Sequence, residues 1–172
     1  MRRSTFLLLA SAVTVAFGFQ LSSDNAFAQD PTNTTATYGA WVVRCDRRNK
    51  EPTCEMLQTL AAQNRQQVIA QVAIGRLPKA ETPRAVLQVP LGVDLTKPAT
   101  LQLGEKAQFQ GRYFVCSANF CFSEIELPKT AADEIAVAKK ASIRFFLQGK
   151  DLTVPVSTEG MAAAFKVAVA TS

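Results

Sequence analysis

This 172-residue chain has four cysteines, and their spacing makes them its main candidates for metal binding, redox chemistry or crosslinking. Cys45 and Cys54 have eight residues between them, and Cys116 and Cys121 have four. Such pairs could bind a metal, exchange disulfides or form structural crosslinks. Zinc sites use cysteines about two to four residues apart, so the first spacing fits a metal poorly. A redox-active thiol typically belongs to a C-x-x-C motif at a helix N-terminus, whereas the second pair lies between two strand-like runs.

Other catalytic chemistry has few candidate residues. The chain has no histidine, which removes the commonest general base and excludes Ser-His-acid and Cys-His mechanisms. Glu124 and Glu126 fall on one face of a predicted strand and could mimic a paired-carboxylate site. That face alternates with Cys121, Ser123 and Ile125, which look directed to the core, so we interpret the glutamates as solvent-facing. We expect no catalytic residue, no cofactor and no metal.

The N-terminus has the parts of a secretory signal peptide. Two arginines precede an apolar stretch over residues 5–19, and Ala26-Phe27-Ala28 fits the small-residue cleavage pattern. The apolar stretch is shorter than the roughly 20 residues that a membrane-spanning helix needs. We therefore predict cleavage after Ala28, no transmembrane span in the mature chain, and a periplasmic or secreted protein.

Removal of that segment leaves 144 residues (172 less 28), the size of one domain with its own core. We assign residues 1–28 to the signal peptide, 29–36 to a flexible leader and 37–172 to a single domain. The full chain carries 19 basic and 14 acidic residues, and the charges are dispersed. We expect no nucleic-acid partner, because an exported protein rarely meets one.

In an exported chain of this size, an even number of cysteines favours disulfides. Three connectivities are formally possible. Local pairing of Cys45 with Cys54 and of Cys116 with Cys121 is the simplest, because each pair flanks a polar, turn-forming segment. Facing residues of a hairpin approach to about 4.5–5.5 Å between Cα atoms, which is within disulfide range. The loop-entropy model gives roughly 2.7 and 2.2 kcal/mol for the two rings.

Two segments are candidate contact sites. The first is the basic loop Arg47–Pro52, with Arg47, Arg48 and Lys50. It could bind an anionic partner, but binding tails usually carry five or six like charges in a row, so an ordinary solvated loop is the simpler interpretation. The second is an unpaired edge strand, for which we propose the proline-interrupted segment 84–95.

Apolar residues recur at every second position in segments bounded by Gly, Pro and Asn, which predicts an antiparallel all-β sandwich or barrel. About nine short strands are expected, over residues 41–45, 54–60, 68–74, 85–89, 101–103, 113–116, 121–127, 143–147 and 152–156.

Two stretches have helical rather than alternating patterns. Residues 128–140 predict a short helix with a capping-box-like start at Thr130 and Asp133. Residues 157–168 predict a second helix, in which Ser157 caps the first turn. A stripe of apolar residues would place this helix against the core, namely Met161, Ala164, Phe165 and Ala168.

Several motifs in this order resemble the invasion-associated locus B family of exported bacterial proteins. They are YGAWVVRCD (38–46), CEMLQTL (54–60), VPLGVDL (89–95), YFVCSANFCF (113–122) and GMAAAFKVA (160–168), after a signal peptide. The resemblance implies an immunoglobulin-like β-sandwich with the two local cysteine pairs. It also implies a periplasmic or surface location and, in pathogenic members, a link to host-cell entry. It supplies no catalytic residue.

Three functions are compatible with these patterns. The first is a non-enzymatic, disulfide-stapled module that binds an envelope or host-cell protein, whose identity and oligomeric state the sequence does not specify. The second is a periplasmic thiol-disulfide enzyme or chaperone that uses Cys116 and Cys121. The third is a small-ligand carrier, which the ordinary aliphatic residues at inward positions disfavour because they predict a filled core.

Overall fold

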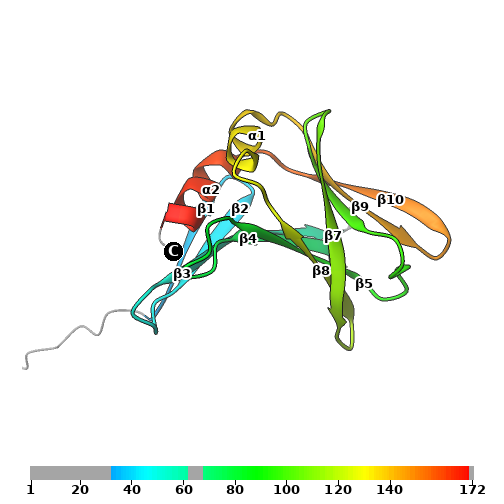
Figure 1. Cartoon of the computed structure of the whole chain (residues 1–172), viewed down its shortest axis with the longest axis horizontal. Coiled ribbons are helices and arrows are strands. Elements are labelled where there is room, and N and C mark those ends of the chain that lie inside the picture. Colours follow the sequence, from blue (N-terminus) through cyan, green and yellow to red (C-terminus); the bar gives the residue numbers. More distant parts are fainter. Residues whose placement is uncertain (1–31, 62–67, 171–172) are drawn as a thin grey trace, which may run out of the picture. The chain divides into compact units, whose positions relative to one another are not determined.

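The structure is a computed structural model that describes residues 32–61 and 68–170 (Figure 1). The predicted signal peptide and its cleavage site lie outside these residues. Ten strands and two helices occur within the described ranges: β1 (Asn33–Tyr38), β2 (Trp41–Asp46), β3 (Thr53–Ala61), β4 (Val68–Gly75), β5 (Arg84–Pro90), β6 (Ala99–Leu103), β7 (Ala107–Cys116), β8 (Phe120–Glu126), α1 (Ala131–Val137), β9 (Ala141–Leu147), β10 (Lys150–Val156) and α2 (Met161–Ala170).

The all-β class and the nine expected strands are present, and β1 is an additional strand. The sequence predicts a flexible leader over 29–36, but residues 33–36 pair with β2, with Thr35 opposite Arg44 and Ala36 opposite Val43. This strand has few apolar residues, so it lacks the alternation that reveals the others. Its threonines nevertheless favour extended backbone.

The ten strands form one antiparallel sheet in the order β1-β2-β3-β4-β5-β8-β7-β6-β9-β10. The immunoglobulin-like sandwich that the family resemblance implies has two separate sheets, and the structure differs because β7 pairs on both sides. Residues 107–111 pair with β6, whereas most of the second half of β7 pairs with β8. A strand shared in this way joins two layers into one curled sheet.

Gly111 is the position at which β7 passes from one neighbour to the other. A Cβ atom at this position would lie 2.5 Å from the Ser123 Oγ and 2.7 Å from the Ile125 Cγ1. These distances are shorter than any van der Waals contact, so β7 can cross so close to β8 only with glycine here.

Alternate side chains of the strands fill the inner face of the sheet, and Trp41, Phe145 and Leu87 are fully buried there. The helix α2 packs on β1–β4 and α1 packs on α2, as Figure 1 shows at one end of the sheet. The predicted apolar stripe of α2 is buried: Met161, Ala164, Phe165 and Ala168.

The predicted cap of α1 is wrong in detail. The helix does begin after Thr130, but this residue has helical backbone angles of −68° and −17° and its side chain makes no capping hydrogen bond. A capping side chain normally needs extended backbone at this position. In contrast, the Ser157 hydroxyl accepts a hydrogen bond from the Glu159 N–H at 3.2 Å, as expected for the turn before α2.

A partly buried polar cluster joins the residue after β10 to β2 and β3. The Gln58 side chain accepts a hydrogen bond from the Ser157 N–H at 2.8 Å, and its Nε2 donates to the Ser157 carbonyl at 3.3 Å. The same carbonyl accepts a 2.9 Å hydrogen bond from the Trp41 indole. Segments about 100 residues apart in sequence are thereby fixed together, and each side-chain polar atom of Gln58 and Trp41 has at least one hydrogen-bond partner.

The turn between β1 and β2 packs against the turn before α2. Gly39 and Gly160 have φ values of 56° and 75°, and the Ala40 N–H donates to the Glu159 carbonyl at 3.2 Å. A Cβ atom at Gly160 would lie 2.1 Å from the Tyr38 carbonyl oxygen. This close approach therefore requires glycine for both backbone conformation and space.

We expect Gly160→Ala to lower the free energy of unfolding by ~3 kcal/mol or more, because left-handed backbone costs about 1–2 kcal/mol and the methyl group also forces the two turns apart. Gly149→Ala is the matched control, since Gly149 has a φ of 82° but nothing within 4 Å of its Cβ position. Urea denaturation of both variants measures the difference. Equal losses would show that the contact with Tyr38 contributes nothing.

Tyr113 carries a hydroxyl group that is buried and has no hydrogen-bond partner among the described residues. Burial disfavours the phenolate, and the nearby Asp94 carboxylate repels it, so the pKa of Tyr113 rises to about 12. Above the usual pKa near 10, the unfolded chain loses this proton while the folded chain keeps it. The titration of Tyr113 therefore lowers the free energy of unfolding progressively as the pH rises from about 10 to 12.

Tyrosine ionisation can be followed by ultraviolet absorbance as the pH rises. Subtracting the titration curve of the Tyr113→Phe variant from that of the unmodified chain should leave the ionisation of Tyr113, with a midpoint near pH 12. In the same range, stability should fall less steeply with pH in the variant, because it has no phenol to titrate at this position. A midpoint near 10 would contradict the burial of the hydroxyl.

Candidate functional site

The sheet has two different faces. Its inner face holds the core, whereas the alternate side chains of β2–β5 and β8 point away from it. We call this second surface the outer face, and define it by the register rows Arg44–Glu55–Gly75–Arg84–Glu126 and Val42–Leu57–Ala73–Val86–Glu124. The helix α2 packs on the strands through its buried core stripe and therefore lies on the inner face.

The outer face carries one exposed and two half-buried phenylalanine side chains near the tip of the β7–β8 hairpin. A β-bulge between Tyr113 and Val115 inserts Phe114 as an extra residue, so that Val115 lies opposite Phe122. Phe114 and Val115 are 57% and 49% exposed, and the Phe114 and Phe122 ring centroids lie 6.4 Å apart. We call Phe114, Val115, Phe120 and Phe122 the aromatic patch.

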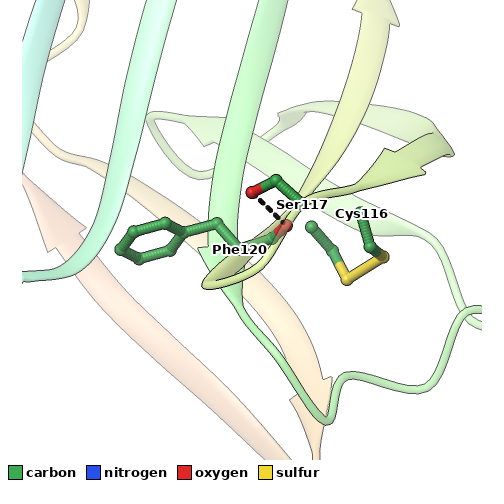
Figure 2. Close-up of a disulfide and its surroundings, with 4 residues drawn as sticks. Cys116, Ser117 and Phe120 are labelled. Carbon is green, nitrogen blue, oxygen red and sulfur yellow. Dashed lines mark hydrogen bonds between the residues drawn. A yellow bond between two sulfur atoms is a disulfide. The ribbon is translucent and has the colours of Figure 1, made fainter.

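The hairpin tip is held by a disulfide and a tight turn. Cys116 and Cys121 are bonded, with 4.0 Å between their Cα atoms. The Ser117 N–H donates to the Phe120 carbonyl at 2.8 Å, and the Ser117 hydroxyl donates to the same oxygen at 3.3 Å. Figure 2 shows the Phe120 ring pointing away from the disulfide. Residues 113–123 contain no charged side chain, so the tip is a rigid and neutral surface.

The other disulfide joins Cys45 to Cys54 beside the basic loop. Within this loop, the Arg48 guanidinium forms a bidentate ion pair with Asp46, with 3.0 Å from Nε to each carboxylate oxygen. The hydrogen bonds from Arg48 lower the pKa of Asp46 to about 2. Arg47 and Lys50 remain exposed. The local ion pair thus offsets part of the positive charge that the sequence suggests for an anionic partner.

The segment 84–95 is not an edge strand. Its strand β5 pairs with β4 on one side and β8 on the other, and the edges of the described sheet are β1 and β10. Pro90 is tolerated because it is the last residue of β5. The edge prediction failed because a proline near a strand end was interpreted as a break in the strand itself.

The two candidate carboxylates lie on the outer face. Glu124 forms a 2.8 Å ion pair with Arg84, and Glu126 is exposed. The alternating residues Cys121, Ser123 and Ile125 are buried, as expected. Glu124 is therefore a member of a surface ion pair, and its arrangement suits solvation rather than acid–base chemistry.

The cysteines are all oxidised in this structure, in the two pairs that the sequence predicts. Neither pair lies at a helix N-terminus, because all four residues belong to strands or their ends. Within residues 32–61 and 68–170 there is no cluster of three or more potential metal ligands. In the same ranges, no helix is long and apolar enough to span a membrane. This arrangement suits structural staples better than thiol exchange.

No sequence motif marks the aromatic patch as a contact site. Its available signal was the uncharged run 113–123, in which several apolar residues occur without the polar partner that alternation requires. The direction of Phe114 could not be inferred, because the bulge changes the alternation at this point.

We expect Cys116→Ser combined with Cys121→Ser to lower the free energy of unfolding by about 2 kcal/mol, because the unfolded chain loses a closed ring. Thermal denaturation against Ser117→Ala, which removes only one hydroxyl hydrogen bond, measures the specific effect of the disulfide. The unmodified chain, isolated from an oxidising compartment, should show no alkylatable thiol. Reaction of Cys116 before reduction would contradict the structural role of this bond.

Comparison with known proteins gives two matches of different kinds. The sequence profile of the family described as Invasion associated locus B (IalB) protein matches residues 41–168. The solved structure of invasion associated protein B from Bartonella henselae matches at a TM-score of 0.65 and 20% identity, over 76% of this chain and 91% of that chain. No curated protein matches the sequence. The structural likeness shows a shared fold, and the profile match shows that this chain belongs to the invasion-associated locus B family.

Proposed function

We propose that this chain is an exported, non-enzymatic protein-interaction module of the bacterial envelope, which contacts other proteins through its aromatic patch. Membership of a family described as invasion associated supports an envelope role with a link to host-cell entry. The two disulfides support an oxidising compartment. Export through a signal peptide cleaved after Ala28, to the periplasm or the exterior, belongs to the same proposal.

The observation that carries this proposal is the exposure of the aromatic patch. Phe114 is more than half exposed although it lies on a rigid, disulfide-bonded hairpin. Large exposed apolar side chains that cluster together mark contact sites, and aromatic residues provide much of the energy of protein interfaces. Since the hairpin is fixed before binding, little conformational entropy would be lost on association.

A protein surface fits this patch better than a lipid bilayer does. The apex of the hairpin is Ser117-Ala118-Asn119, which is exposed and polar, whereas the aromatic rings lie farther back along the strands. An element that enters a bilayer needs its apolar side chains at the leading end, because polar groups are costly in hydrocarbon. The patch therefore suits lateral contact with another folded surface.

The titratable groups with shifted pKa values support a non-enzymatic role. The pKa of Asp46 is lowered by Arg48, and the pKa of Asp94 is lowered because the Thr96 hydroxyl and N–H donate to its carboxylate. The pKa of Tyr113 is raised mainly by burial. Each shift has a local structural cause: an ion pair for Asp46, a turn for Asp94, and burial next to Asp94 for Tyr113. Such causes are those of structural groups as well as of catalytic ones, and none of them needs a substrate. The basic loop with Arg47 and Lys50 is kept as a secondary contact.

Site-specific photo-crosslinking in living cells tests the proposed contact. A photoreactive phenylalanine analogue in place of Phe114 is expected to capture a defined envelope or host protein, and a further Phe122→Ser change should reduce capture roughly tenfold or more. The same analogue in place of Val137, which is 70% exposed on α1, is the matched control.

Capture that is equal at the two positions would contradict the use of the patch. Mixed disulfides with many exported proteins, lost after Cys116→Ser, would instead support the thiol-disulfide function.

A further inference from the structure

A hollow of about 610 Å³ lies on the outer face, which also carries the aromatic patch. Ala73, Gly75 and Val86 contribute to its lining, and the first two have little or no side chain to fill the space. The ion pairs Arg44–Glu55 and Arg84–Glu124 flank it, at 2.6 Å and 2.8 Å. The lining also includes Asp46, which is paired with Arg48, and Arg76. Because the carboxylates that line the hollow all have cationic partners, the site suits an uncharged, apolar side chain.

The hollow and the aromatic patch share one face and are joined by continuous strand register. Ala73 in the hollow lies opposite Val86 on β5, and Val86 lies opposite Glu124 on β8. Phe122 of the patch is two residues before Glu124 on β8, so its side chain points to the same face. One molecule therefore presents, on the same face, a projecting aromatic group and a separate recess that can receive it. This is the arrangement that a self-complementary, two-fold interface needs.

The charges on this face are also self-complementary. Arg112 makes no ion pair with the described residues, and Glu126 accepts only a 3.4 Å hydrogen bond from Thr82. Both line a shallow hollow of about 310 Å³ with Arg84 and Glu124. On this face, each molecule thus carries a cation and an anion that no ion pair among the described residues uses.

We propose that the occupant of the hollow is a second copy of this chain, in a two-fold dimer that packs outer face on outer face. The Phe122 ring of each copy enters the hollow of the other at Gly75. Arg112 of each copy pairs with Glu126 of the other. The inference rests on the proposed function, for which it names a partner of the aromatic patch.

The register supports this arrangement quantitatively. Positions on the outer face can be estimated by laying the sheet out flat, with about 4.8 Å between strands and 3.3 Å per residue along each strand. The two-fold axis is then placed midway between Phe122 and Gly75, which is near Val86. The axis lies in the plane of the face, so that the two outer faces meet, and its position brings Phe122 of one copy over Gly75 of the other by construction. The independent outcome is that Arg112 of one copy then falls within about 5 Å of Glu126 of the other. One operation thus satisfies the apolar and the charged contacts together.

Dimerisation would keep the aromatic patch from water until another protein competes for it. The side chains of the aromatic patch would contact either the second copy or a different protein. The two therefore compete for the patch and exclude each other. The self-association should accordingly be weaker than the binding of the functional partner.

Sedimentation equilibrium of the exported chain, at up to about 100 μM, tests the dimer in the micromolar range. Phe122→Ser and Ala73→Arg, which remove the ring or fill the hollow, should each raise the dimer dissociation constant roughly tenfold or more. Val137→Ser is the matched control, since it removes an apolar side chain that is 70% exposed on α1. This control should leave the dissociation constant unchanged.

Charge reversal distinguishes this interface from other modes of association. Arg112→Glu and Glu126→Arg should each weaken the dimer, and the two changes together should restore it. A chain that stays monomeric, or a dimer that none of these variants weakens, overturns the inference. If Phe114 still captures a partner protein in cells while no dimer forms, the proposed function stands and only the second copy is excluded. If the dimer forms but no other protein is captured, the proposed contact with an envelope or host protein fails.

Discussion

The fold depends on the hydrogen bonds between Gln58 and Ser157. Ten antiparallel strands could lie in an open curved sheet, with the end of β10 far from β3. The Gln58 amide instead binds both backbone groups of Ser157, and the Trp41 indole binds the same carbonyl. Each hydrogen bond contributes only about 1 kcal/mol in net terms, but the loss of one partner leaves a buried polar group unpaired. The cost of opening this contact is therefore larger than the sum of its bonds.

The same contact explains two of the sequence motifs. Ser157 can reach Gln58 only because the turn before α2 lies directly against the turn after β1, and this requires Gly39 and Gly160. YGAW and EGM are thus parts of one structure, although about 120 residues separate them. Their order along the chain allowed family membership to be predicted, and the profile match confirms it. Their contact could not be predicted, because no local pattern shows which distant turn a glycine faces.

The sequence allowed the all-β class, the strand positions and both helices to be predicted, since each depends on local periodicity. The single sheet could not be predicted. Whether β7 pairs with one neighbour or two depends on the space around Gly111, where Ser123 and Ile125 leave no room for a side chain. A glycine in a strand indicates a close approach but not its partner. The sandwich and the single curled sheet therefore give the same alternating pattern.

Features of the candidate site that depend on the spacing of residues along the chain could be predicted from the sequence. Features that depend on the direction of side chains could not. The cysteine pairs followed from short separations, but the aromatic patch needed the bulge at Phe114. Gln58 and Ser157 already close the fold, so the positions of the two disulfides need another explanation. Cys45 and Cys54 border the hollow, and Cys116 and Cys121 border the aromatic patch. Each staple therefore fixes one half of the surface that we propose for binding, where an unbonded hairpin end would fray and disperse its side chains.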